Sequence, residues 1–216
     1  MMVNFIHKYL GLTAAALFGL MTLSTVSSAA VPEVKFTPIS KNGAFEIRDY
    51  PSLLTAEITM PGSRDDVLEA ADTLLSTYVK GNNFSDRRIG FKKPVLHKLA
   101  SPLTSAITPA RSPTGKFGQL WTVSYVLTEE DSLEALPRPA DRRIDLIQLP
   151  PRRMAVLQFS GLWSDQNLDQ HRDQLEAMLT EMGLTPVGDP IFALYDEFWQ
   201  PYFWRRNEVL WEITAP

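Results

Sequence analysis

Apolar residues recur at helical spacing in two segments of the chain. The first lies between Ser63, which can cap a helix, and Gly81, which can end one. The second runs from about residue 167 to 182 and ends at Gly183. The two stripes contain Val67, Leu68, Ala71, Leu74, Leu75 and Tyr78, and Leu168, His171, Leu175, Met178, Leu179 and Met182. Because such a stripe is typical of a helix packed on a core, we predict two amphipathic helices.

Other segments alternate apolar and polar residues, which is the pattern of half-buried strands. In residues 119–127, for example, Trp121, Val123 and Tyr125 alternate with Thr122 and Ser124. Further strands are predicted at 45–50, 53–60, 93–99, 144–149, 154–159, 191–195 and 207–213. Segments 110–118 and 129–142 are rich in Pro, Gly and charge and are predicted to be loops.

The order of these elements repeats at an offset of 99 residues. Residues 47–51 then align with 146–150, residues 56–58 with 155–157, and Gly62 with Gly161. We infer an internal duplication with repeats at about 45–130 and 144–213. The predicted fold class is α+β: a distorted antiparallel β-barrel or curved sheet with two packed helices and pseudo-two-fold symmetry.

The first 30 residues have the features of an export signal. Lys8 precedes a stretch of apolar and small residues, and Ser28-Ala29-Ala30 offers a cleavage site. The apolar stretch is short for a membrane span, although an uncleaved N-terminal anchor is the alternative. We therefore expect a signal peptide at 1–30, export to the periplasm or the medium, and no integral membrane span after cleavage.

The remaining residues, 31–216, are enough for a single domain. Without the leader, 20 basic residues stand against 25 acidic ones, a net charge of −5. Such a chain, without a concentrated basic patch, is not expected to bind nucleic acid. Since it contains no cysteine, thiolate ligands and covalent heme attachment through C-x-x-C-H are excluded.

Five short segments stand in a characteristic order. They are Phe45-Glu-Ile-Arg-Asp-Tyr-Pro51, Tyr78-Val-Lys-Gly-Asn82, Pro94-Val95, Phe159-Ser-Gly161 and Arg205-Arg-Asn-Glu-Val209, the last preceded by an aromatic run from Tyr195. Together they resemble the SOUL heme-binding family over nearly the whole of residues 31–216. This resemblance implies a barrel-like sheet with two helices, and noncovalent binding of heme or a related tetrapyrrole in a hydrophobic cleft.

The chain also departs from the family pattern. Lys92-Lys93 replaces the Met-Thr expected before Pro94, and residues 69–77 lack the Met and basic residues of the family's first helix. Cations for the heme propionates are therefore expected among Lys92, Lys93, Arg205 and Arg206. Because neighbouring strand residues point to opposite faces, the two arginines should diverge, and a structural role in fixing the loop is the alternative for either.

Aromatic residues and histidines complete the candidate site. Trp199 and Tyr202, with Phe203 and Trp204, could stack on a porphyrin or close the end of the sheet. Tyr78 lies at the family-like end of the first helix and is a further candidate. His171 and His97 lie on apolar faces, where each could ligate iron or serve as a core histidine bonded to a carbonyl.

Motifs for phosphate loops, serine hydrolases, zinc proteases and dinucleotide binding are missing from the sequence. The leading hypothesis is an exported protein that binds heme or another tetrapyrrole for buffering or delivery. One alternative is a module of the same fold that binds a small apolar ligand or a partner without heme. Another is an enzyme that modifies tetrapyrroles, with His171 or a carboxylate as proton donor.

Overall fold

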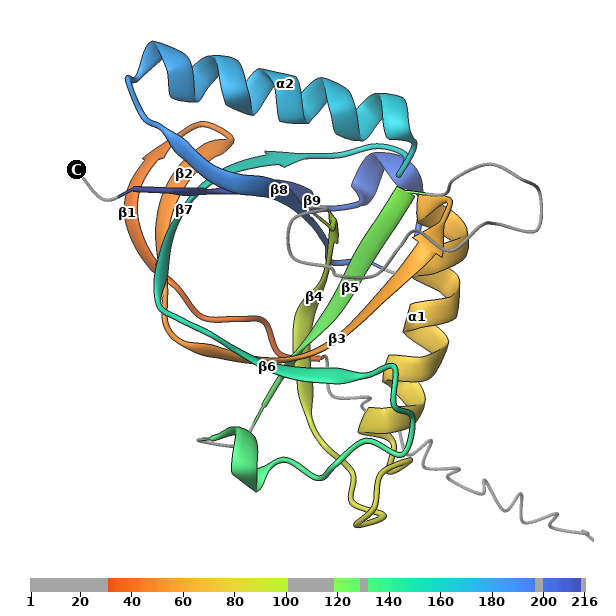
Figure 1. Cartoon of the computed structure of the whole chain (residues 1–216). Coiled ribbons are helices and arrows are strands. Elements are labelled where there is room, and N and C mark those ends of the chain that lie inside the picture. Colours follow the sequence, from red (N-terminus) through yellow and green to blue (C-terminus); the bar gives the residue numbers. More distant parts are fainter. Residues whose placement is uncertain (1–30, 101–118, 129–131, 197–199, 215–216) are drawn as a thin grey trace, which may run out of the picture. The chain divides into compact units, whose positions relative to one another are not determined.

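The structure is a computed structural model that describes residues 31–100, 119–128, 132–196 and 200–214. These residues form nine strands and two α-helices, with two short 3-10 turns (Figure 1). In chain order the elements are β1 (Thr37–Asn42), β2 (Phe45–Tyr50), β3 (Leu53–Gly62), α1 (Arg64–Val79), β4 (Phe91–Leu99), β5 (Gln119–Leu127), η2 (Leu133–Ala135), β6 (Asp145–Leu149), β7 (Arg152–Phe159), α2 (Asp165–Glu181), β8 (Pro186–Leu194), η3 (Tyr202–Trp204) and β9 (Asn207–Ile213).

All nine strands belong to one antiparallel sheet in the order β1-β2-β7-β9-β8-β4-β5-β3-β6. Without β1, this order is symmetric about its centre. Each strand of the first repeat has a counterpart at the mirrored position: β2 corresponds to β6, β3 to β7, β4 to β8 and β5 to β9. The central pair, β8 and β4, therefore lies on the pseudo-two-fold axis. The predicted α+β fold class is confirmed, and the strand order has the predicted pseudo-two-fold arrangement.

The two repeats exchange their first strands. β2 of the first repeat pairs with β7 of the second, and β6 of the second pairs with β3 of the first. The sheet curves strongly (Figure 1), but no ladder among the described residues joins its outermost strands, β1 and β6. The expectation of a β-barrel is thus corrected: the sheet is curved and open at its edges.

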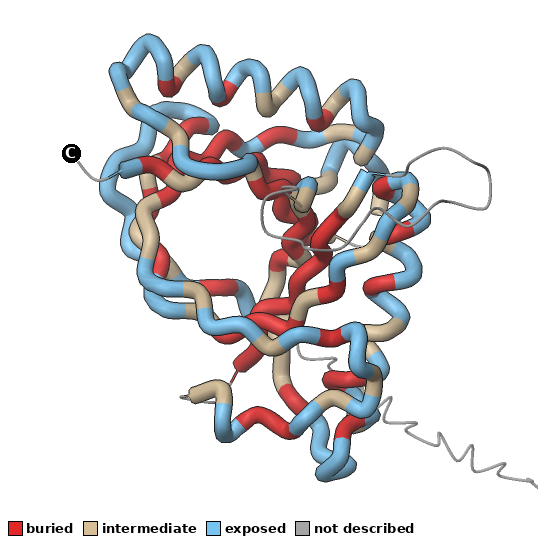
Figure 2. The backbone as a smooth tube through the Cα atoms, in the orientation of Figure 1, coloured by how far each residue is buried: buried red, intermediate tan, exposed pale blue. Residues whose placement is uncertain are grey.

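Each helix covers one half of the same face of the sheet. Ser63 caps α1 by accepting a hydrogen bond from the Asp66 backbone N–H at 3.3 Å, and Ser164 caps α2 in the same way through the Asn167 N–H at 3.3 Å. Beneath α1, Leu75 packs with residues of β3 and β5, and beneath α2, Leu175 packs with residues of β7, β8 and β9. In Figure 2, the buried positions of both helices recur on their sheet-facing side.

The opposite face of the sheet, the inner face, has a third apolar cluster. It includes Leu96, Val126, Met154, Val156 and Leu210, which alternate along their strands with residues beneath the helices. The segment before β1 adds Val34 and Phe36 to this cluster. Two backbone hydrogen bonds hold it there, from Lys93 N–H to Pro32 O at 2.8 Å and from Val34 N–H to Lys93 O at 2.9 Å.

Candidate ligand-binding site

The segment before α2 and the connection between β8 and β9 meet at the N-terminal end of α2. The Gly161 N–H donates to the Tyr202 carbonyl at 3.0 Å. Gly161 has a φ of +117°, and a Cβ there would lie 2.9 Å from Asn167 Nδ2. This close approach explains a glycine at the end of the Phe159-Ser-Gly161 motif.

The meeting point carries a cluster of exposed apolar side chains that we call the aromatic rim. The exposed fractions are 55% for Leu162, 52% for Tyr202, 56% for Phe203 and 70% for Trp204. Phe203 makes edge contacts with both neighbours, at ring-centroid distances of 5.4 Å and 5.0 Å. Because exposed apolar side chains gathered in one place mark interaction sites more often than scattered ones do, this rim is the first candidate for ligand contact.

Arg205 places a cation at the aromatic rim. Its guanidinium carbon lies 4.7 Å from the ring centroid of Trp163, and its Nε donates to the Gln200 carbonyl at 2.8 Å. The Trp163 ring is itself fixed, because its Nε1–H donates to Oδ1 of buried Asn207 at 2.7 Å. Arg64, at the start of α1, donates to the Trp163 carbonyl. The rim therefore rests on the first turns of both helices.

Arg206 points to the inner face, away from the rim. Its Nη2 donates to Glu33 at 2.6 Å, and its guanidinium carbon lies 3.4 Å from the ring centroid of Tyr195. Its backbone N–H donates to Asp196. The two arginines diverge as predicted, although both lie just before β9 rather than within it. Arg206 ties the N-terminal segment to the loop after β8.

Several other predicted site residues lie apart from the rim. Lys92 and Lys93 are half-buried at the start of β4, and the Lys93 backbone binds the N-terminal segment. Tyr78 is fully buried beneath α1 and donates to the Pro137 carbonyl at 2.9 Å, and burial raises its pKa to about 12. Trp199 lies outside the described residues. Of the predicted set, the structure brings together Tyr202 and Arg205.

The two histidines occupy different environments. His171 is half-buried on α2, where its Nδ1 bonds the Asn167 carbonyl at 2.7 Å and its ring stacks on Phe159, with centroids 4.1 Å apart. His97 is buried on the central strand β4, stacked on Phe192 at 5.3 Å. Neither ring nitrogen of His97 has a hydrogen-bond partner among the described residues, and burial lowers its pKa to about 3. The contacts of His171 are those of a core histidine bonded to a carbonyl, and those of His97 are apolar.

Sequence reasoning missed a buried charged network on the inner face. Arg48 donates to both oxygens of Glu208, at 2.8 Å and 3.0 Å, and to Glu46 at 2.7 Å. The Tyr195 hydroxyl also donates to Glu208, at 2.7 Å. Burial opposes the charge of Arg48, but its hydrogen bonds with Glu208 raise its pKa above the ordinary value. One signal was available: Arg48 and Glu208 both belong to the motifs that resemble the SOUL family.

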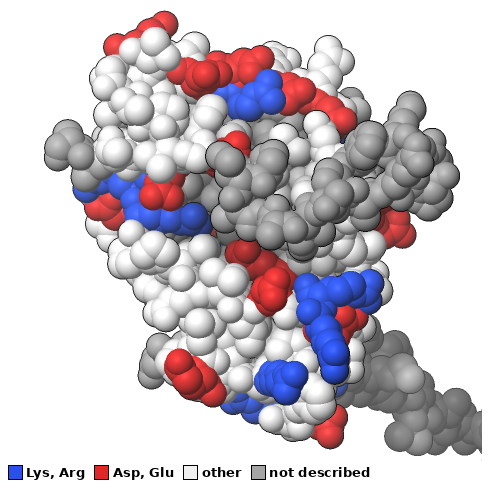
Figure 3. Space-filling model, viewed as in Figure 1, with Lys and Arg blue, Asp and Glu red and all other residues white. Residues whose placement is uncertain are grey.

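Charge elsewhere on the surface narrows the choice of site. Acidic residues predominate along α2, with Arg172 among Asp165, Asp169, Asp173, Glu176 and Glu181, and Figure 3 shows this acidic row along the helix. The outer side of α2 therefore disfavours an anionic ligand. Within the described ranges, no helix is long and apolar enough to cross a membrane. Those same ranges contain no cluster of three or more His, Cys, Asp or Glu that could hold a metal ion.

The curved sheet, the paired helices and the rim at their N-terminal ends define a two-repeat α+β domain with one exposed apolar cluster beside a cation. The sequence model described as SOUL heme-binding protein matches residues 31–212. The chain therefore belongs to the SOUL heme-binding family, as its motifs indicated.

Individual relatives are distant. Human Heme-binding protein 2 is 24% identical over 142 residues, a match that covers 65% of this chain and 64% of the length of the human protein. The C-terminal domain of EcmrR has a TM-score of 0.58 at 9% identity, covering 80% of this chain and 98% of that domain. An uncharacterized conserved protein from Listeria innocua has a TM-score of 0.54 at 10% identity, covering 85% and 94% of the two chains. At these identities the two structures show the fold alone.

Proposed function

We propose that this protein binds heme or a related tetrapyrrole noncovalently at the aromatic rim. The observation that carries the proposal is the juxtaposition of exposed Tyr202, Phe203 and Trp204 with Arg205 at the N-terminal ends of both helices. Membership of the family and the name of the human relative support the same ligand class.

The chemistry of the rim fits the ligand. A tetrapyrrole is flat and apolar with anionic propionates at one edge, so it matches an aromatic surface beside a guanidinium. A charge-assisted hydrogen bond to Arg205 would contribute about 1.5–3 kcal/mol. Among the described residues, the hydrogen bonds and ring contacts of His97 and His171 include none of the rim side chains. We therefore propose that stacking and propionate pairing hold the complex.

Binding at the rim also agrees with the size of the interior. The pocket on the inner face that is bounded by Leu96, Met154 and Ile191 has a cavity volume of ≈20 Å³. Because one water molecule needs roughly 10–15 Å³ on this measure, the pocket is far too small for a porphyrin. The hydrophobic cleft expected from the resemblance is therefore replaced in this proposal by an exposed surface.

A Soret titration of the purified protein with hemin tests the proposal. Arg205→Met is expected to weaken binding about ten- to hundredfold, by the usual conversion of the lost bond into affinity. Arg206→Met is the matched control, because the neighbouring arginine faces Glu33 and Tyr195 instead. His171→Ala should leave the Soret maximum unchanged, since iron ligation by His171 is not part of the proposal.

Two results would overturn this function. If saturable Soret changes are missing, heme is not the ligand, and the exposed rim is better explained as a partner-binding surface. If Arg206→Met weakens binding as much as Arg205→Met while both variants keep the native melting temperature, the propionates lie on the inner face.

We also propose that the protein is exported and buffers or delivers the tetrapyrrole. The support is the leader-like sequence ending at Ser28-Ala29-Ala30, which precedes the described domain. The intact mass of the native protein, recovered from the periplasm or the medium, should correspond to a chain that begins after Ala30. A cytoplasmic species that begins at Met1 would contradict export.

A further inference from the structure

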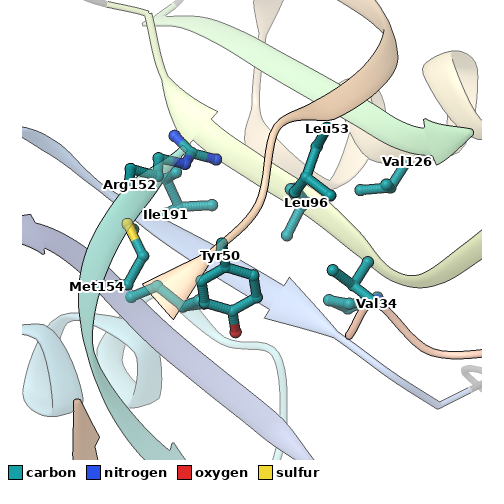
Figure 4. Close-up of a pocket in the computed structure, with 10 residues that line it drawn as sticks. Val34, Tyr50, Leu53, Leu96, Val126, Arg152, Met154 and Ile191 are labelled. Atoms are coloured by element: carbon teal, nitrogen blue, oxygen red, sulfur yellow. The ribbon is translucent and has the colours of Figure 1, made fainter. Parts of the chain in front are cut away.

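The inner face of the sheet contains a narrow pocket whose walls are almost entirely apolar (Figure 4). Met154 and Ile191 lie on one side, Leu96 and Val126 on the other, and Tyr50 lies between them. The space within the pocket is ≈360 Å³ when its opening to solvent is included, of which ≈20 Å³ admits the centre of a water molecule. Since the enclosed space holds little more than one water molecule, a thin apolar chain would lie along the open part of the slot.

Among the described residues that line this pocket, Arg152 is the one that is charged. Its side chain lies beside Ile191 at the end of the slot away from Val126 (Figure 4). Among the described residues, its guanidinium has no hydrogen bond or ion pair, whereas the guanidinium of neighbouring Arg153 makes two bonds to Asp49. Burial lowers the pKa of Arg152 below its ordinary value, although Glu212 and Glu57 partly offset this effect.

An unpaired, partly desolvated guanidinium is a preferred partner for an anion. A second pocket adjoins the first and shares Leu96, Arg152 and Ile191 with it. The described residues that line it include Arg152, Lys98 and Glu57, with the Ser124 hydroxyl as a further polar group. Glu212 also interacts with Arg152. The apolar slot therefore opens toward a polar end at which the Arg152 guanidinium has no bonded carboxylate among the described residues.

We propose that the inner pocket binds a small amphiphile with an unbranched apolar tail and a carboxylate head. The tail lies between Leu96, Met154 and Ile191, and the carboxylate accepts hydrogen bonds from Arg152. This site is separate from the aromatic rim, because the rim lies at the ends of the helices whereas the slot lies on the helix-free face. It does not depend on tetrapyrrole binding.

One wall of the slot includes Val34, which belongs to the segment before β1. This segment is attached by the Lys93 backbone bonds and by the exposed pair Glu33–Arg206 at 2.6 Å.

Calorimetric titration with octanoate, octylamine and octanol tests the proposal, because the three probes share one tail and differ in the head group. Octanoate is expected to bind saturably and at least tenfold more tightly than octylamine or octanol. Arg152→Met should weaken octanoate about ten- to hundredfold, and Arg153→Met is the matched control. Leu53 lines the slot and is half-buried, so Leu53→Trp should also reduce binding by obstructing the slot.

The result that overturns the site is equal affinity for octanoate and octylamine, or equal loss of binding in Arg152→Met and Arg153→Met. Circular dichroism and thermal unfolding must show that each variant is folded. Hemin competition separates this site from the proposed function. Octanoate binding should persist in the presence of hemin and in Arg205→Met, and displacement of octanoate by stoichiometric hemin would refute a separate site.

Discussion

The two faces of the sheet use the same strands in opposite ways. Along β7, Ala155 and Leu157 pack beneath α2, while Met154 and Val156 point to the inner face. The helix-covered face is mainly apolar in both halves, and Leu75 and Leu175 belong to its two clusters. The inner face instead combines apolar residues with the buried network around Glu208.

The difference shows what a helix does for a sheet. A face covered by a helix can be wholly apolar, because both surfaces lose water together. The inner face has no helix and is concave. It encloses the hydrogen-bonded network of Arg48, Glu208 and Tyr195, and it leaves a slot beside Arg152. We expect the free energy of unfolding to depend on both faces of the sheet. Ligand selection should depend on the regions that no helix covers, which are the aromatic rim and the slot.

Removing Glu208 should have the largest effect on stability. Glu208→Ala leaves the buried guanidinium of Arg48 without its two-point partner, and breaking such a pair costs about 3–5 kcal/mol. Asp49→Ala is the control, because its pair with Arg153, at 2.7 Å, is partly exposed and should contribute less than about 1 kcal/mol. Urea unfolding measures both. Equal losses in the two variants would mean that the inner network is not energetically distinct.

Truncating the helix contacts should cost nearly as much. Leu75→Ala and Leu175→Ala each remove a fully buried side chain, at an expected cost of about 2–5 kcal/mol. The costs should be similar because the two leucines have equivalent places in the two repeats. Leu162→Ala, at an exposed position, should change the free energy of unfolding by less than about 0.5 kcal/mol. If one of the two core substitutions proves neutral, the repeats are not energetically equivalent.

His97 should make a smaller, pH-dependent contribution. Its pKa is lowered from the ordinary 6.5 to about 3, first by burial and then by the positive charge of Arg64. As pH falls below 6.5, the unfolded chain binds a proton that the folded protein does not bind until about pH 3. Stability is therefore lost across this window as pH falls, by up to about 1.4 kcal/mol per pH unit.

His97→Phe keeps a ring against Phe192 and Trp121 and removes the titration. Urea unfolding of both proteins at several pH values between 7 and 4 should show a shallower loss in the variant. His171→Ala, with its half-buried ring at the surface of α2, is the control for a general histidine effect. Parallel pH profiles in wild type and His97→Phe would show that His97 is not buried as a neutral ring.

The sequence predicted most elements from the spacing of their apolar residues, including strands such as β5 and β9 that the structure buries on both faces. The strand at Thr37–Asn42 was not predicted, since all of its residues are exposed and no apolar period marks it. The prediction for α2 began two residues late, because the capping residue is Ser164 and the first turn is polar. Closure of the sheet depends on whether its edge strands meet, which local periodicity cannot determine.

Site residues were harder to predict than elements. Some of their contacts join residues that are far apart in the sequence, which local patterns do not reveal. Examples are the backbone bonds between Lys93 and the N-terminal segment and the ion pair between Arg206 and Glu33. The helical spacing of Tyr78 is the same for a residue that lines a binding site and for one that fills the core, so it could not distinguish the two. In the structure Tyr78 is in the core, and its hydroxyl donates to the Pro137 carbonyl. The divergence of Arg205 and Arg206 was predicted from strand alternation, although in the structure both residues precede β9.

The exchange of first strands between the repeats has a consequence during synthesis. On the ribosome, β2 emerges about a hundred residues before its partner β7, and its ladder cannot form until Arg152–Phe159 has followed. For that interval the nascent chain carries an open strand edge, which is a site for mispairing with other chains. Contacts of such long sequence separation also slow folding. A chain stopped after the first repeat would expose this edge permanently, so the second repeat completes the fold of the first.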